Sequence, residues 1–197
     1  MQALLVVDAQ NEFSAKGLRP VPYHARALER IIRHVQLARE DRRPIAWVRH
    51  HNKPHESKAF LPGSWGADWS PGLALINNHG REKLFEKDVY GAFTGTGLED
   101  WLRGIDVTGV LIVGFYAHMC LSTSVREALI RGFDVQIDPE ATGARDLEDS
   151  VLGNLTADEV RRSALLQLVD MGATLVPSAR RAREIVAAVT GSAEHDE

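Results

Sequence analysis

Short apolar runs alternate with amphipathic stretches along most of the chain. The apolar runs cover residues 3–7, 44–48, 83–86, 110–113, 133–137 and 173–176. Four to six apolar residues without regular polar alternation are typical of strands that are buried on both faces of a parallel sheet. The run at 83–86 is the weakest, because Lys83 and Glu86 frame only two apolar residues.

The segments between these runs have helical spacing. Helices are expected over residues 22–40, 98–103, 120–131, 156–170 and 178–189. Thr156 and Glu159 form the Ser/Thr-x-x-Glu pattern of a capping box, which marks one start. Connections that are too long for hairpins predict an α/β fold: a single-domain, three-layer, doubly wound sandwich with a mostly parallel central sheet. We expect this domain to span residues 1–190 and a flexible polar tail to follow at 191–197.

One segment, residues 50–79, has no clear periodicity and is rich in Gly, Pro and aromatic residues. A loop of about 30 residues inside a compact domain is more often functional than accidental. Phe60, Trp65 and Trp69 give it a large apolar content for a surface segment. We therefore expect a homo-oligomer, a dimer or tetramer, with this loop in its interface.

Composition narrows the range of partners and the compartment. The chain has 27 acidic and 23 basic residues, a formal charge of −4, which gives no basic footprint for nucleic acid. No apolar stretch approaches the roughly 20 residues of a membrane-spanning helix, and the start of the chain lacks the charged region of a signal peptide. The single cysteine suits a reducing compartment. The expectation is a cytoplasmic protein without membrane or nucleic-acid partners.

Three residues with catalytic chemistry follow strands of the predicted sheet. Asp8 ends the first strand, Lys87 follows the third, and Cys120 lies six residues beyond the fourth, at the start of a helix. The carboxyl ends of parallel strands share one edge of a sheet, so these side chains are expected to meet there. Each also has a plain structural reading: a helix cap for Asp8, a solvated side chain for Lys87 and a small buried hydrophobe for Cys120.

Other chemical signals are weak. No nucleotide-binding or serine-hydrolase motif is present. His50, His51 and His55 invite a metal site, but no carboxylate lies between them at ligand spacing. We expect no metal and no cofactor, although the region around His50 and His51 keeps that alternative open.

Four segments, in this order, resemble the isochorismatase-like cysteine hydrolases, a superfamily with nicotinamidases, N-carbamoyl amide hydrolases and isochorismatases. They are the opening strand with its aspartate (4–13), the loop at 62–67, the lysine segment (86–98) and the nucleophile segment (113–124). The resemblance covers residues 3–182 and implies the family's Rossmann-like fold. Relatives usually form dimers or tetramers, which agrees with the expected oligomer.

The resemblance assigns a role to each residue of the trio. Asp8 would accept the thiol proton and later protonate the leaving amine, Lys87 would stabilise the charges, and Cys120 would attack the carbonyl to form a thioester. The backbone N–H groups of Tyr116 and Cys120 would form the oxyanion hole, beside a cis peptide between Phe115 and Tyr116. The candidates for contact with substrate are Phe13, Trp65, Tyr90 and His118.

Two departures from family patterns refine the prediction. Tyr116-Ala117-His118 is shared with true isochorismatases, which cleave a vinyl ether but carry glycine in place of Cys120, so the thiol favours the amidases. Nicotinamidases follow their second strand with a metal-binding aspartate and histidine, whereas this chain has no aspartate after Val48.

The function expected is therefore cysteine-dependent hydrolysis of a C–N bond in a small amide or carbamoyl substrate, through an Asp-Lys-Cys triad. Vinyl-ether hydrolysis of the isochorismatase type, and a non-catalytic relative used for binding or assembly, are the alternatives. The charges around Cys120 do not settle its thiol pKa from sequence, because Lys87 and the helix N-terminus lower it and Asp8 raises it.

Overall fold

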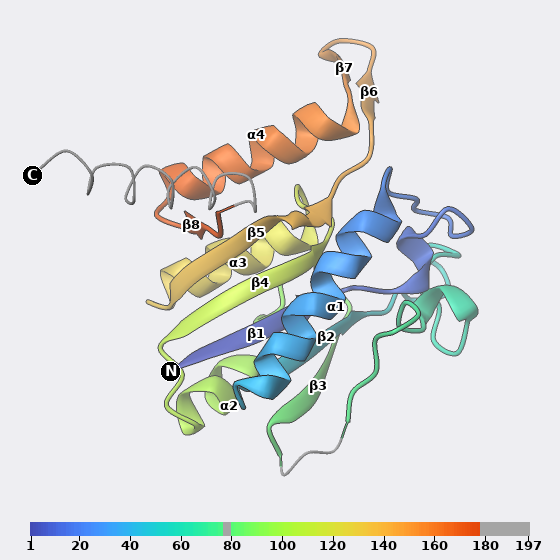
Figure 1. Ribbon diagram of the computed structural model, residues 1–197. Helices are drawn as coiled ribbons and strands as arrows, with labels where there is room; N and C mark the ends of the chain where they lie inside the picture. Colours follow the sequence, from blue (N-terminus) through green and yellow to red (C-terminus); the bar gives the residue numbers. More distant parts are fainter. Residues whose placement is uncertain (77–79, 178–197) are drawn as a thin grey trace, which may run out of the picture.

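A six-stranded, wholly parallel sheet organises the protein (Figure 1). The computed structural model describes residues 1–76 and 80–177. The sheet has the order β3-β2-β1-β4-β5-β8. The strands are β1 (Gln2–Val7), β2 (Ile45–His50), β3 (Glu82–Lys87), β4 (Gly109–Phe115), β5 (Asp134–Gly143) and β8 (Thr174–Leu175). Counted along the chain this is the doubly wound order 3-2-1-4-5-6, in which the direction of winding reverses between β1 and β4.

Helices cover both faces of this sheet, which confirms the predicted three layers (Figure 1). Helix α1 (His24–Glu40) packs on one face. The opposite face carries α2 (Leu98–Gly104), α3 (Cys120–Ile130) and α4 (Ala157–Asp170). Two separate apolar cores result, one on each side of the sheet.

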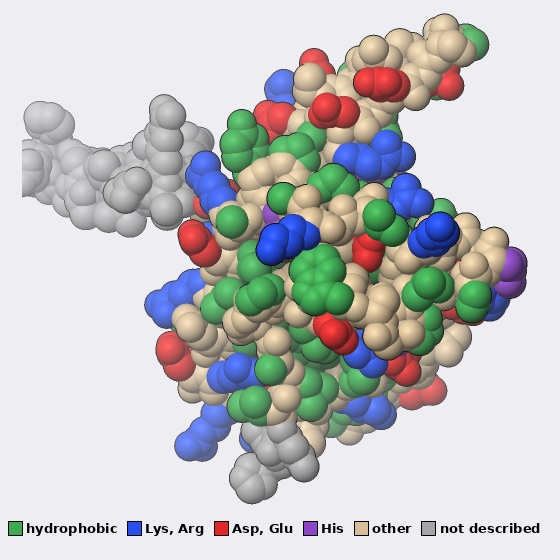
Figure 2. All heavy atoms as spheres, turned by 90° about the vertical axis from the view of Figure 1, so that its right-hand side faces the viewer, with side chains coloured by type: hydrophobic (Ala, Val, Ile, Leu, Met, Phe, Trp, Pro, Cys, Tyr) green, Lys and Arg blue, Asp and Glu red, His purple; other side chains and the backbone are tan. Residues whose placement is uncertain are grey.

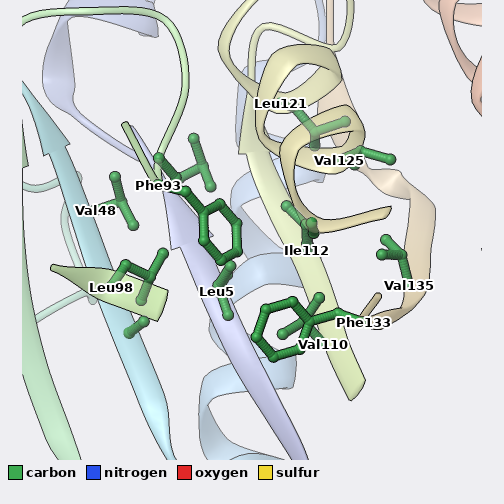
Figure 3. Close-up of a cluster of buried hydrophobic side chains, with 14 of the residues drawn as sticks. Leu5, Val48, Phe93, Leu98, Val110, Ile112, Leu121, Val125, Phe133 and Val135 are labelled. Atoms are coloured by element: carbon green, nitrogen blue, oxygen red, sulfur yellow. The ribbon is translucent and has the colours of Figure 1, made fainter. Parts of the chain in front are cut away.

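The central strands are buried on both faces, as their unbroken apolar sequences require. In the core shown in Figure 3, Leu5 of β1 and Ile112 of β4 belong to one cluster with Phe93 and with Val125 of α3. Complete burial of an aliphatic side chain of this size contributes about 1.5–3 kcal/mol. The carboxyl ends of β1 and β4 are thus held by a rigid, well-packed base.

Most predicted elements agree with the structure, and Thr156 and Glu159 form both bonds of the expected capping box. Helix α1 begins at His24 rather than at residue 22, because Tyr23 adopts a left-handed conformation with φ 59°. Strand β5 runs six residues further than expected, to Gly143. The helix expected at 178–189 and the tail at 191–197 lie outside the described residues.

An antiparallel hairpin was missed. Strands β6 (Leu147–Asp149) and β7 (Gly153–Leu155) pair with each other and form no part of the main sheet. Their side chains are almost all exposed, so neither shows the period-2 alternation by which a half-buried strand is recognised.

The aromatic residues of the long loop are less exposed than the sequence predicted. Phe60 is buried against Phe13 and His50, and Trp69 packs against Trp47. Of the three aromatic residues named for the interface, Trp65 alone is exposed, at 51%. The loop contains one 3₁₀ turn, η2 (Trp65–Ala67), and a single bridge joins Trp69 to Gln10. No helix within the described ranges is long and apolar enough to cross a membrane.

Candidate active site

The residues with catalytic chemistry meet at the carboxyl edge of the sheet, where its winding reverses. Asp8 follows β1 directly, Lys87 is the last residue of β3, and Cys120 begins α3 after the turn that follows β4. Gly114 allows β4 to approach β1 closely here, since a Cβ atom at this glycine would lie 1.8 Å from the Val7 carbonyl oxygen. Open α/β sheets bind their ligands at such a reversal point.

Asp8 and Lys87 form a buried ion pair. Lys87 Nζ donates to Asp8 Oδ2 at 2.7 Å, and both side chains have no exposed surface. Lys87 also donates to the Val89 carbonyl at 3.1 Å. Asp8 Oδ1, in contrast, has no nitrogen or oxygen donor among the described residues. A fully buried carboxylate thus keeps one oxygen available to accept a proton.

Cys120 is buried beside this pair and interacts with both charges. Burial, and next the negative charge of Asp8, raise the pKa of the Cys120 thiol well above its usual range, against the opposing effect of Lys87. Burial by itself lowers the pKa of Lys87, but Asp8 and Cys120 outweigh it, and that pKa is raised. At neutral pH Cys120 is therefore a thiol beside the charged Lys87, and the balance that the sequence left open falls on the side of the protonated sulfur.

Two backbone N–H groups near the thiol are free of protein acceptors. Within the described part of the chain, neither the amide of Tyr116 nor that of Cys120 donates a hydrogen bond. The peptide bond between Phe115 and Tyr116 is cis. The Tyr116 carbonyl accepts from the amides of Met119 and Leu121, which fixes the turn between β4 and α3. These two free donors are those that the resemblance named for the oxyanion hole.

Sequence reasoning missed the residue that joins the loop to the sheet at this point, Gln10. It is completely buried; its Nε2 donates to the carbonyls of His50 and Ala67, and its Oε1 accepts from the amide of His50. Gln10 thereby ties the chain after β1 to the end of β2 and to η2. The sequence offered one signal for Gln10: it is a polar residue two positions after the aspartate that ends the strand.

His50 does not offer a free ligand for a metal. Its Nδ1 lies 3.3 Å from Lys87 Nζ and its Nε2 lies 2.8 Å from Asn52 Oδ1, so both ring nitrogens face protein groups. A buried ammonium beside Nδ1 repels a cation. No group of three potential ligands is present among the residues the structure describes. The residues after β2 therefore do not fit a metal, and the absence of one stays a prediction.

A cleft opens on the surface beside the chain that follows η1 (Asn11–Phe13), and we call it the mouth cleft. Its lining comprises residues 14–16 and 18–25 together with Asn11, Trp65, Pro71, Arg145 and Asp146. Tyr116 contacts one residue of this lining: its hydroxyl donates to the Arg19 carbonyl, and its ring packs edge-on against the buried Phe13. Burial raises the pKa of Tyr116 to about 12, so this phenol stays neutral.

The four proposed substrate contacts are divided among different places. Trp65 lines the mouth cleft. Phe13 is buried, and His118 stacks on Tyr116 with both ring nitrogens buried and without hydrogen-bond partners in the described chain. Burial, with Arg145, lowers the pKa of His118 to about 4, so its imidazole is neutral. Tyr90 is exposed on the loop after β3, away from the lining of the mouth cleft.

Comparisons with known proteins agree with this architecture. The family model of the isochorismatase domain matches residues 2–184. Nicotinamidase 3 of Arabidopsis thaliana is 30% identical over 83% of this chain and 88% of its own length. Streptothricin hydrolase of Streptomyces noursei is 31% identical over 75% of this chain and 56% of its own length. The crystal structure of an isochorismatase from Pseudomonas putida superposes with a TM-score of 0.83 at 27% identity, covering 91% of this chain and 89% of that one.

Proposed function

The chain belongs to the isochorismatase family of hydrolases, and from that premise we propose that it hydrolyses the C–N bond of a small amide or carbamoyl compound with Cys120 as nucleophile. The names of two relatives support the amide as substrate class: one is a nicotinamidase, and the other hydrolyses streptothricin. No name of a relative identifies the substrate of this chain.

In the first half-reaction, the Cys120 sulfur attacks the carbonyl carbon while its proton passes to Asp8. The raised pKa of the thiol makes this transfer necessary, because little thiolate exists before attack. The carbonyl oxygen becomes an oxyanion, for which the free amides of Tyr116 and Cys120 are suitable donors. Asp8 then protonates the departing nitrogen, which leaves as ammonia or an amine, and a thioester stays on Cys120.

In the second half-reaction, a water molecule attacks the thioester. Asp8, ionised again, accepts a proton from that water, and the carboxylic product leaves as the thiol takes the proton back. Lys87 keeps its positive charge throughout and stabilises whichever neighbour is anionic, Asp8 or the sulfur. The two steps consume one water and return the enzyme to its starting protonation state.

One observation supports catalysis over a purely structural role for the trio: the free oxygen of Asp8. A carboxylate buried for stability alone is expected to have both oxygens saturated by donors, since an unpartnered buried acceptor costs about 1–3 kcal/mol. Asp8 Oδ1 has no nitrogen or oxygen donor in the described chain, and the group beside Asp8 is the Cys120 thiol, whose proton has to move. The site therefore bears a cost that proton transfer explains.

The domain bounds and the cellular location are proposed from the same sequence. The catalytic domain is proposed to span residues 1–190 with a short tail beyond it. A cytoplasmic location is supported by the single, buried cysteine, because a thiol nucleophile functions in a reducing compartment.

The experiment measures release of ammonia or amine from a panel of small amides and carbamoyl compounds, and in parallel the release of a carbonyl compound from a vinyl ether. We expect turnover of at least one amide or carbamoyl compound by the wild type, and none by Cys120→Ala or by Cys120→Ser, the closest match in shape. Hydrolysis of the vinyl ether alone, or equal turnover by wild type and Cys120→Ala, would overturn the proposal.

A further inference from the structure

One face of α3 carries the thiol and two polar side chains that contact another part of the site. Cys120, Ser124 and Glu127 occupy positions i, i+4 and i+7 of this helix, and residues at that spacing lie on the same side of a helix. Ser124 and Glu127 both bind the chain that follows β3, residues 88–94, which we call the lysine loop. A single helix therefore connects the sulfur of the site to the loop that follows Lys87.

Ser124 joins the lysine loop to the Cys120 residue itself. It is completely buried. Its hydroxyl donates to the Cys120 carbonyl at 2.6 Å and accepts from the Ala92 amide at 3.1 Å. The buried hydroxyl thus uses both its donor and its acceptor capacity between the start of α3 and the lysine loop.

Glu127 makes a second connection, further along α3. Its Oε2 accepts from the Phe93 amide at 2.9 Å, and its Oε1 accepts from the Thr94 hydroxyl. Gly91 allows this approach, since a Cβ atom at this glycine would lie 2.3 Å from the Glu127 carboxylate. Hydrogen bonds to a charged acceptor are roughly twice as strong as neutral ones. Glu127 therefore fixes the loop next to Phe93, a member of the core shown in Figure 3.

The beginning of the same loop holds the ammonium group of Lys87. Lys87 Nζ donates to the Val89 carbonyl at 3.1 Å as well as to Asp8, and it interacts with Cys120. Residues 88–94 contain no helix or strand, so contacts with other elements determine where the Val89 carbonyl lies. Figure 2 looks onto the carboxyl edge of the sheet, and the Asp8 and Lys87 side chains form no part of its surface, because neither has exposed area. Protein groups, rather than water, therefore orient this ammonium.

We propose that Ser124 and Glu127 are positioning residues, which anchor the lysine loop to α3 and so hold the Lys87 ammonium at a fixed distance from the Cys120 sulfur. The connection runs from α3 through the loop backbone to the Val89 carbonyl, and from there to Nζ. The interaction between an ammonium and a sulfur depends on their distance, so a looser loop weakens it. The catalytic meaning of this inference rests on the proposed function, but the interaction itself is measurable without a substrate.

The first measurement is the rate of Cys120 alkylation by iodoacetamide in the full chain, whose single cysteine makes the label unambiguous. Glu127→Ala should slow alkylation near neutral pH by about threefold, or half a pKa unit, because the ammonium is displaced rather than removed. Glu127→Gln keeps an oxygen for the Phe93 amide and offers an N–H to the Thr94 hydroxyl, so it should react at the wild-type rate. Ser124→Ala should slow alkylation in the same direction as Glu127→Ala.

A double-mutant cycle determines whether the effect passes through Lys87. In a Lys87→Met background, Glu127→Ala should slow alkylation no further, because no ammonium is left to displace. The same slowing in both backgrounds, or no slowing in either, would overturn the proposal. Faster alkylation of Glu127→Ala would also overturn it, since the loop would then shield the thiol instead of positioning Lys87.

The matched control is Glu159→Ala at the start of α4. Glu159 likewise accepts from a backbone amide and a threonine hydroxyl, both of Thr156. Circular dichroism and thermal melting should show that both Glu→Ala variants are folded and less stable, whereas alkylation should slow in Glu127→Ala alone. Equal slowing in the two variants would mean a general loosening of the fold and would contradict a positioning role.

Turnover separates this inference from the proposed function. On an amide that the wild type hydrolyses, kcat of Glu127→Ala should fall at least as much as its alkylation rate, and Glu127→Gln should restore it. Unchanged kcat in Glu127→Ala would overturn the positioning role and leave the proposed function intact. A wild type that hydrolyses no amide or carbamoyl compound would overturn the proposed function, while the alkylation cycle would still decide whether Glu127 acts through Lys87.

Discussion

Among residues 1–76 and 80–177, two aspartates are completely buried, Asp8 and Asp138, and their surroundings differ in one respect. Asp138 has donors for both oxygens: Oδ2 accepts from His34 at 2.6 Å and from Arg30 at 3.0 Å, and Oδ1 accepts from the amide of Glu140. Asp8 has Lys87 on one oxygen and no nitrogen or oxygen donor in the described chain on the other.

The difference separates a carboxylate that holds elements together from one that is able to react. Asp138 ties α1 to β5, and its saturated oxygens leave no position for a proton. Its pKa is lowered, because the bonds from His34, Glu140 and Arg30 outweigh the effect of burial. Asp8 lies at the reversal point of the sheet, beside the one thiol of the chain. The comparison predicts that the two aspartates fail in different ways when altered.

The largest effect is expected at Asp8. Asp8→Asn preserves size but accepts no proton, and general-base catalysis is worth about 10²–10⁴-fold, so turnover per folded molecule should fall by that factor. Steady-state kinetics on the amide identified in the screen give the result. If this variant turned over substrate at the wild-type rate, the proposed difference in role between Asp8 and Asp138 would be wrong.

Asp138→Asn should cost stability instead. Removal of one partner from a buried charge cluster typically costs 3–5 kcal/mol, and here about 3 kcal/mol is expected because Arg30 is partly exposed. Urea denaturation measures the loss, and turnover per folded molecule should stay within about twofold of wild type. A collapse of turnover with unchanged stability would contradict the structural role.

His118 tests a third polar group, a half-buried imidazole whose two ring nitrogens are buried and form no hydrogen bond in the described chain. Its pKa is lowered from 6.5 to about 4, so the unfolded chain binds the proton first as pH falls. The free energy of unfolding should therefore fall between pH 6.5 and 4, by up to about 3 kcal/mol. His118→Gln should remove this part of the pH dependence, whereas His55→Gln, at an exposed loop position, should not. Parallel curves for all three proteins would show that His118 is not held neutral by the fold.

Lys87→Met tests how strongly the positive charge of Lys87 acts on the Cys120 thiol, and the expected change in reactivity is the smallest of the four. Loss of the positive charge raises the pKa of Cys120 further, so alkylation by iodoacetamide near neutral pH should slow by about tenfold, the equivalent of one pKa unit. Asp8→Asn removes the opposing charge and should not slow alkylation. Equal alkylation of Lys87→Met and wild type across the pH range would show that the trio is uncoupled.

The sequence predicted what depends on local pattern. Buried parallel strands are visible in runs such as residues 3–7, and the strand-ending position of Asp8 follows from the same run. Right-handed crossovers then place strand ends on one edge, which is why the meeting of Asp8 with Lys87 could be expected from positions 79 residues apart.

The parts that could not be predicted depend on long-range contacts. Gln10 acts through the backbone of His50 and Ala67, which no local pattern links to it. Phe60 and Trp69 carry no sign in the sequence of being turned inward, and the pKa of Cys120 depends on burial that only the packed structure supplies. The β6–β7 hairpin has no buried face and hence no periodic signal.

The most direct test of the central claim is mass spectrometry of the intact protein, quenched in acid during turnover of an amide substrate. The account predicts a mass increase equal to the acyl group, located on Cys120, and its loss on treatment with hydroxylamine, which cleaves thioesters. The increase should be absent from Cys120→Ala. Sustained turnover with no acyl group on Cys120 at any quench time, or an acyl group on another residue, would contradict the account.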